Sequence, residues 1–371
     1  MIDRNQRSCN LDVIRIFAFL TVVAVHFFLN VDFYDVTITN PVMLVPICIR
    51  NFCMICVPLF LMLSGYLLKN RTFSLKFYMK LIPTLGIYLL ASLCCMASSF
   101  LVDRGNFSLY ESIRGLFSFS TASYSWYIEM YIGLFLMFPF FNIAYGKSSD
   151  KGKKILVLTA LISTALPSVL NIWRPELSWW LRPGSSKEYF ELVPNQWEAM
   201  YPFTFYFLGA YLRDFPPKIK ALPTFFLMIG VCVLGGLFAF YRSYGYDMGN
   251  SKWTAYPSIL TTVQSVLVFH FLNSVNLSWV GKGGRKILAK LSSWVLGAYL
   301  CSSIFDDWFY PILTERYPSF LRSFLFMPVI VGAIVICSTV LSAILNVIYD
   351  LCQMLVLKCI PKKKIQEAVT E

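Results

Sequence analysis

Long apolar runs recur along the whole chain, and short segments between them carry most of the charge. Runs of 18 or more apolar residues are typical of helices that cross a membrane, because a helix satisfies its own backbone hydrogen bonds in lipid. Hydrophobic residues make up 57% of the chain and charged residues 14%, against about 25% charged in soluble proteins. The sequence therefore predicts an all-α, polytopic membrane protein.

The apolar runs predict ten transmembrane helices in a single integral-membrane domain, residues 1–371. The helical bundle covers about 11–357, and a short basic tail follows at 358–371. The expected helices are 11–31, 51–68, 81–101, 125–145, 154–173, 198–212, 222–241, 254–275, 291–312 and 323–357. Lysines and arginines are about twice as frequent in the segments that this order places inside, and such a bias predicts that both termini are cytoplasmic.

The net charge is +12, and the basic residues cluster in the short loops between the apolar runs. Membrane topology therefore explains it, and no nucleic-acid partner is expected. The eleven cysteines lie mostly within apolar runs, where they act as small hydrophobic residues. Cys53 and Cys56 have the spacing of a metal or redox pair, but no second cysteine pair or nearby histidine completes a site. No metal is expected.

Arg15 and His26 lie inside the first apolar run, "LDVIRIFAFLTVVAVHFFLNV". An ionisable side chain at membrane depth is costly, which makes it a candidate functional residue. Their spacing corresponds to three helical turns plus roughly 20°, so they share one helix face, roughly 16 Å apart along the axis. Asp12 falls on nearly the same stripe. The helix thus carries an acid, a base and an imidazole in one line.

Each of these groups has a functional and a structural interpretation. Histidine is the usual general base near neutral pH, but His26 can also be a core residue bonded to a neighbouring helix. Arg15 can anchor a phosphate or a carbonyl oxygen, or it can extend to the interface. Asp12, one turn away, can hold Arg15 in a local ion pair.

Two long segments are expected outside the membrane, 102–124 and 174–197, and both are rich in aromatic and polar residues. They fit an interfacial belt of Trp and Tyr. Alternatively, they form a lid or a platform for a glycan.

Four stretches resemble the membrane acyltransferase 3 family in order and spacing. "NLDVIRIFAFLTVVAVHFF" is similar to the family's opening helix, in which ten residues separate an Arg from a His. The others are "VPLFLMLSGYLL" (57–68), "SWYIEMYIGLFLMFPF" (125–140) and "FYFLGAYLR" (205–213). The resemblance covers essentially the whole chain.

The resemblance implies an integral-membrane O-acyltransferase of the bacterial cytoplasmic (plasma) membrane. Such an enzyme transfers an acyl group, usually acetyl, from acyl-CoA to a carbohydrate hydroxyl on a cell-surface or lipid-linked glycan. His26 would be the catalytic residue and Arg15 its companion. Acetyl-CoA is then the expected donor, and the partners are this donor, a carbohydrate acceptor and the lipid bilayer.

The same resemblance suggests further site residues. Ser64 and Tyr66 match the second-helix motif, and Trp126, Tyr127 and Glu129 match the fourth, so these five are candidate substrate contacts. Glu129 could pair with a group on the first helix or remain an interfacial carboxylate. Lys76 and Lys80 occupy the family's basic positions before the third helix. They could bind CoA phosphates, or they could be ordinary positive-inside charge.

The chain departs from the family at a late helix, where many members carry a second histidine. "GAYLCSSIFDDWFY" (297–310) has Ser302 and Ser303 there, followed by Asp306 and Asp307. Asp306 is therefore added to the candidate substrate contacts, as a polar group near the outer surface. His270, the other histidine, is expected to have a capping role. His26 is left as the candidate imidazole for chemistry.

A transporter or flippase of a polysaccharide or lipid-linked sugar is the rival interpretation, because polar residues at depth also mark transport paths. Transporters tend to show internal repeats with broken helices in matching halves. The sequence shows no such symmetry. An accessory protein without activity is a third interpretation.

Overall fold

The computed structural model describes residues 9–171, 192–248 and 253–359, and in these ranges it contains helices and no β-strand. An isolated bridge pairs Ile38 with Tyr244. Most of the outer segment 174–197 and nearly all of the basic tail lie outside the described residues. The all-α prediction is confirmed for the described part of the chain.

Eight helical segments among the described residues are long and apolar enough to cross a membrane. Three of them combine shorter helices. Pro41–Leu68 contains α2 (Leu44–Cys53) and α3 (Cys56–Leu68), and Leu75–Val102 contains α4 (Leu75–Tyr78) and α5 (Leu81–Val102). Asp150–Leu170 contains α8 (Asp150–Thr164) and α9 (Pro167–Leu170). The other five are α1 (Cys9–Asn30), α7 (Trp126–Lys147), α12 (Ala221–Ser243), α14 (Lys282–Arg316) and α16 (Met327–Cys359).

Two of the ten predicted spans correspond to helices that are short for a bilayer. The prediction at 198–212 corresponds to α11 (Tyr201–Asp214), with 14 residues, and the one at 254–275 to α13 (Ile259–Ser274), with 16. At about 1.5 Å per residue, these helices measure roughly 21 and 24 Å, below the ~30 Å of a bilayer core. By length and composition, eight helical segments of the described residues qualify as spans, and the predicted count of ten is not confirmed.

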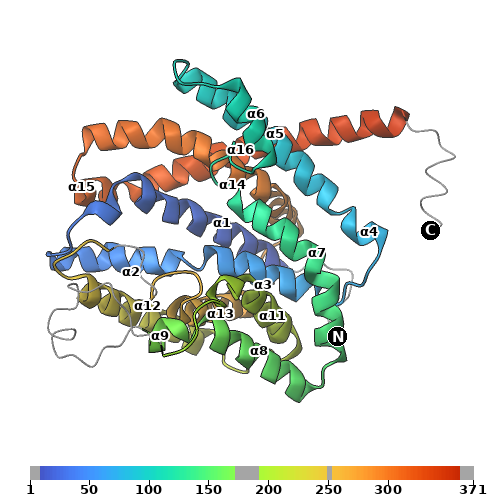
Figure 1. Cartoon of the computed structure of the whole chain (residues 1–371), viewed down its shortest axis with the longest axis vertical. Coiled ribbons are helices and arrows are strands. Elements are labelled where there is room, and N and C mark those ends of the chain that lie inside the picture. Colours follow the sequence, from blue (N-terminus) through green and yellow to red (C-terminus); the bar gives the residue numbers. More distant parts are fainter. Residues whose placement is uncertain (1–8, 172–191, 249–252, 360–371) are drawn as a thin grey trace.

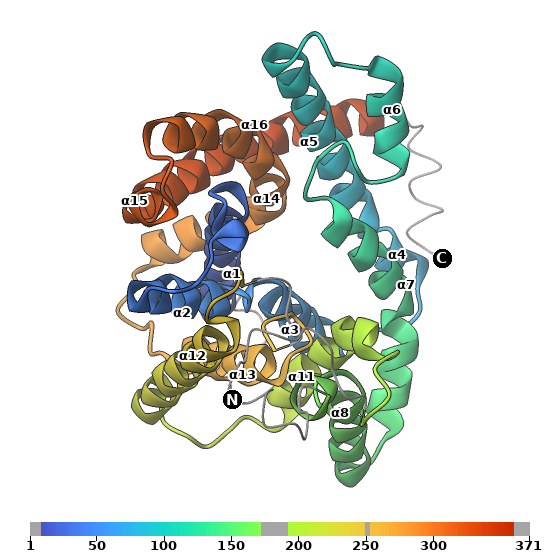
Figure 2. The same ribbon diagram turned by 60° about the vertical axis from the view of Figure 1, so that its left-hand side comes forward.

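Helix α1 lies at the centre of the bundle. It contacts α3, α13, α14 and α16. Among the eight candidate spans, α1 has the largest share of buried residues. Figure 1 shows α14 and α16 on one side of α1, and α11, α12 and α13 on the other. In Figure 2, α5 and α7 lie on one flank of the molecule, connected through α6 (Leu109–Phe117), and α5 packs against α14 and α16. The stripe predicted on the first helix therefore lies in the interior of the molecule.

The break between α2 and α3 falls at Met54 and Ile55. Pro58 explains it, because proline has no N–H to donate to the Met54 carbonyl and its ring crowds that turn. An interrupted helix at membrane depth is tolerated where it is buried or lines a cavity. Cys56 and Val57, directly after the break, line the main cavity described below.

Glycines allow α3 and α11 to approach closely. A Cβ added at Gly65 would lie 1.8 Å from the Tyr206 carbonyl oxygen, and one at Gly209 would lie 1.9 Å from the Met62 carbonyl oxygen. No side chain fits at these distances, and small residues at such crossings are a common device in membrane helices. The packing of α3 against α11 thus explains Gly65 in the stretch 57–68 and Gly209 in the stretch 205–213.

Asn142 ties α7 to the end of α3. Its amide nitrogen donates to the carbonyls of Leu68, at 2.8 Å, and Arg71, at 2.7 Å, while its oxygen accepts from the Tyr206 hydroxyl at 2.7 Å. The side chain is buried. A buried amide with both donor hydrogens and its acceptor in use fixes the register of three elements.

The close approach of α3 and α11 leads to a stability prediction. We expect Gly209→Ala to lower the free energy of unfolding by about 1–3 kcal/mol, because the added methyl group forces the two backbones apart. Thermal unfolding in detergent micelles measures the change.

Gly230→Ala on α12 is the matched control. A Cβ there meets nothing within 4 Å, so helix propensity predicts equal or slightly higher stability. Equal melting temperatures for both variants would contradict the packing argument.

Candidate active site

A cavity of about 290 Å³ lies between α1, α3, α7 and α14, with additional contacts from Thr84 of α5 and from Tyr256. Arg15 and His26 both line it, so two of the three ionisable residues of the α1 stripe face the same space. Most of the remaining wall is aliphatic or aromatic. An apolar cavity with a few convergent polar groups is the usual form of a small-molecule site.

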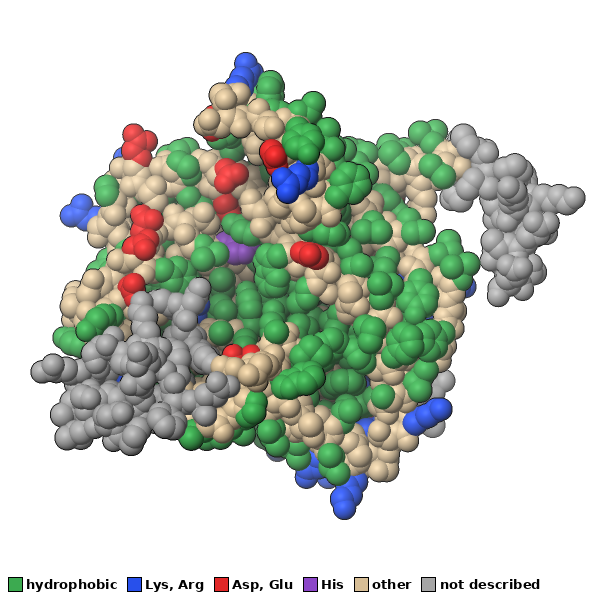
Figure 3. Space-filling model, viewed as in Figure 1, with side chains coloured by type: hydrophobic (Ala, Val, Ile, Leu, Met, Phe, Trp, Pro, Cys, Tyr) green, Lys and Arg blue, Asp and Glu red, His purple; other side chains and the backbone are tan. Residues whose placement is uncertain are grey.

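The cavity wall is visible from outside. Figure 3 shows a histidine within a hollow over α1, surrounded mainly by hydrophobic side chains. His26 is the histidine that α1 contributes. The His26 imidazole is buried, with a relative exposure of 7%, and it lines the cavity.

At one end of the cavity, Arg15 is held by two neighbours. An Arg15 guanidinium nitrogen donates to the Ser292 hydroxyl of α14 at 2.7 Å, and it lies 3.7 Å from the Asp12 carboxylate. Asp12 is buried, whereas Arg15 is partly exposed. This geometry agrees with the local ion pair expected from the sequence, and it fixes where the guanidinium can meet a ligand.

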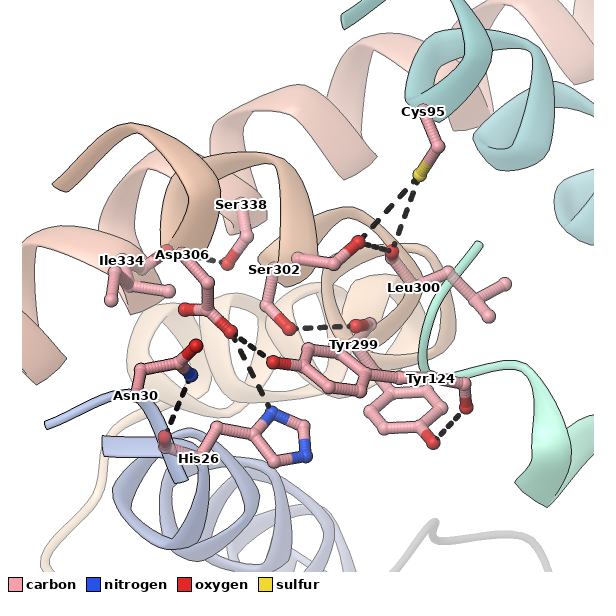
Figure 4. Close-up of polar contacts among 11 residues, drawn as sticks. His26, Asn30, Cys95, Tyr124, Tyr299, Leu300, Ser302, Asp306, Ile334 and Ser338 are labelled. Carbon is pink, nitrogen blue, oxygen red and sulfur yellow. Dashed lines mark hydrogen bonds and ion pairs between the residues drawn. The ribbon is translucent and has the colours of Figure 1, made fainter. Parts of the chain in front are cut away.

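At the other end, His26 faces a carboxylate and a phenol ring (Figure 4). Its Nδ1 lies 3.9 Å from Oδ2 of Asp306, on α14. Its ring stacks on Tyr124, with centroids 3.6 Å apart and an interplanar angle of 26°. The Tyr124 hydroxyl donates to Oδ2 of Asp306 at 2.6 Å. Nε2 points away from Asp306 (Figure 4).

Tyr124 lies just before α7. Burial and the Asp306 carboxylate raise the pKa of its phenol well above the usual range, so the hydroxyl stays protonated and acts as a donor. Tyr124 is not among the site residues that the sequence predicts. Its only signal was its place in the aromatic segment 102–124, two residues before Trp126.

Three predicted substrate contacts lie on the cavity wall: Ser64, Trp126 and Tyr127. The others do not. Tyr66 packs against Phe269 and lies below the guanidinium of Arg213. Glu129 is exposed on α7, so pairing with α1 is not part of this structure.

Asp306 also lies outside the cavity wall, behind His26. Lys76 and Lys80 are exposed on α4 and at the start of α5, away from the cavity. Within the described ranges, no three His, Cys, Asp or Glu side chains lie close enough together to hold a metal ion. His270 Nε2 donates to the Ile219 carbonyl at 2.9 Å, and the residue has no part in the cavity.

The described chain is a bundle of apolar helices, and one imidazole and one guanidinium line its main apolar cavity. Such an arrangement is typical of a binding or catalytic site at membrane depth. The family model of the acyltransferase domain matches residues 10–346, nearly the whole chain, and the protein belongs to this acyltransferase 3 family. It is therefore an integral membrane acyltransferase. No curated protein and no solved structure matches the sequence significantly.

The cavity leads to a prediction about size. Ser64→Phe places a phenyl ring in the space between Arg15 and His26, and we expect acyl transfer to fall by on the order of 100-fold, because the reacting groups can no longer align. Transfer by purified protein in proteoliposomes measures the effect.

Ser99→Phe introduces the same ring at an exposed position of α5 and should leave transfer within about twofold. The melting temperatures of both variants should match the wild type, because neither ring displaces a packed core side chain. Normal transfer by Ser64→Phe would show that this cavity is not the site.

Proposed function

We propose that the protein transfers a short acyl group, acetyl in the simplest case, from acyl-CoA to a hydroxyl of a cell-surface or lipid-linked carbohydrate. One observation carries the proposal: a single cavity reaches both Arg15 and His26. We place the enzyme in a bacterial plasma membrane with Arg15 near the cytoplasmic face, as the distribution of loop charges suggests.

The donor would approach from the Arg15 end. A guanidinium binds phosphate or carbonyl oxygens through fixed, charge-assisted hydrogen bonds, and Ser292 and Asp12 hold this one in place. The volume of about 290 Å³ suits the thioester end and an acceptor hydroxyl, and leaves the nucleotide end of CoA outside.

His26 would act as the general base. Nε2 takes the proton of the acceptor hydroxyl while the hydroxyl oxygen attacks the thioester carbonyl carbon. The carbon–sulfur bond breaks, and the CoA sulfur takes the proton back from the imidazolium. The products are an ester of the carbohydrate and free CoA. Transient acylation of His26 is the second scheme compatible with the same geometry.

The two histidines provide a matched test of this role. His26→Gln should lower kcat by 10²–10⁴-fold, roughly the contribution of a positioned base. His270→Gln should stay close to the wild type, because that residue lies outside the cavity. Acetyl transfer from radiolabelled acetyl-CoA to membrane glycans, normalised to protein abundance, measures both. Wild-type transfer by His26→Gln would overturn the proposal.

Arg15 can be tested with a shortened donor. Arg15→Gln should raise KM for acetyl-CoA by about 10–100-fold, the equivalent of one charge-assisted hydrogen bond. With acetyl-pantetheine, which lacks the phosphates, the change should be much smaller if the guanidinium binds a phosphate group.

Arg71→Gln removes an exposed arginine that does not line the cavity, and it controls for the general loss of positive charge. An equal rise in KM for both donors would assign Arg15 to the thioester carbonyl instead of a phosphate. An Arg15→Gln enzyme with unchanged kinetics would remove Arg15 from the site.

A further inference from the structure

Asp306 is a buried carboxylate with incomplete pairing. Its relative exposure is 2%. Oδ2 accepts from Tyr124, whereas Oδ1 has no hydrogen-bond partner among the described residues. The nearby Tyr310 hydroxyl is also buried and has no hydrogen-bond partner among the described residues. A single neutral hydroxyl is a weak compensation for a buried negative charge.

His26 can supply the missing positive charge. Its Nδ1 is buried, has no hydrogen-bond partner in the described ranges, and lies 3.9 Å from Oδ2 of Asp306. No lysine or arginine of the described chain forms an ion pair with this carboxylate within 4.0 Å. An imidazolium at His26 would therefore complete a buried ion pair, which neutral His26 does not.

Tyr124 holds both members of this pair. Its ring lies against the imidazole face, and its hydroxyl binds the carboxylate. A single side chain thus restricts the tilt of the imidazole and the position of Oδ2 together. With Nδ1 directed at Asp306, Nε2 remains for the cavity (Figure 4).

The segment before α7 is built to hold Tyr124 in place. The Tyr299 hydroxyl binds the Tyr124 carbonyl, and the buried Ser125 hydroxyl binds the carbonyls of Phe119 and Ala122. Phe119 has a φ of +53°, a conformation that costs a bulky residue energy and often marks functional segments. Several contacts therefore converge on the position of one phenol ring.

We propose that Asp306 and Tyr124 are positioning residues that act through His26. Together they direct Nε2 toward the acceptor hydroxyl and stabilise the imidazolium that forms when it takes the proton. This inference rests on the proposed role of His26 as base, and it gives Asp306 a different role from the substrate contact expected from the sequence. It also explains how one histidine works without a second on the late helix.

The neighbouring carboxylate offers a matched control. Asp306→Asn should lower kcat by at least about 100-fold, with KM for acetyl-CoA and for the acceptor within about threefold of the wild type. Asp307→Asn removes a charge one residue along α14, at an exposed position, and should leave kcat within about twofold. A substrate contact would instead change KM, and equal kcat values for the two variants would overturn the proposal.

The two contacts of Tyr124 can be removed separately. Tyr124→Phe keeps the ring stacked on His26 and loses the bond to Asp306, so kcat should fall by about tenfold. Tyr124→Leu loses both contacts and should approach Asp306→Asn. If Tyr124→Phe and Tyr124→Leu both match the wild type, Tyr124 has no positioning role.

A double-variant cycle separates positioning from a general structural effect. In the His26→Gln background, Asp306→Asn should cause no further loss of kcat, because residues that act as one unit are not additive. A further 100-fold loss would assign Asp306 an effect independent of His26 and overturn the inference. Melting temperature and acetyl-CoA binding, measured for each variant, identify any that fails to fold.

Asp306→Glu provides a variant that retains the charge if Asp306→Asn does not fold. It should recover part of the activity. If Asp306→Glu folds but transfers no faster than His26→Gln, the positioning role is also contradicted. The outcome is separable from that of the proposed function. Loss of transfer in His26→Gln with normal transfer in Asp306→Asn rejects only the present inference.

Discussion

The polar stripe of α1 must be satisfied inside an apolar bundle, and much of the site depends on this constraint. Ionisable groups cannot remain unpaired at membrane depth without a large cost. Helix α14 supplies the facing groups: Ser292 binds Arg15 at one end of the cavity, and Asp306 lies 3.9 Å from His26 Nδ1 at the other. The extensive packing of α1 against α14 follows from the same need.

The remaining helices create the space in which these groups can act. Pro58 interrupts the α2–α3 segment, and the residues after the break line the cavity. Asn142 and the glycine crossing of α3 and α11 fix the opposite wall. Because these contacts are rigid and lie away from Arg15 and His26, they can maintain the cavity without using its polar groups.

The segment between α6 and α7 contributes Tyr124 to the candidate active site. It belongs mostly to the segment 102–124, for which the sequence predicts an interfacial belt or, alternatively, a lid or a platform for a glycan. Within it, the strained Phe119 and the bonds of Ser125 shape the turn that brings Tyr124 to His26. A lid formed by 174–197 lies largely outside the described residues, so it stays a prediction.

The sequence by itself determined the membrane class, the helical fold and the shared face of Arg15 and His26, since all three follow from local periodicity and the cost of charge in lipid. It also carried the family resemblance, which the family model confirms. Only the tertiary structure decided that Tyr66 and Glu129 lie off the cavity wall, that α11 and α13 are short, and that Asp306 and Tyr124 meet at His26. These contacts join residues far apart in the chain, and helix packing, not local pattern, brings them together.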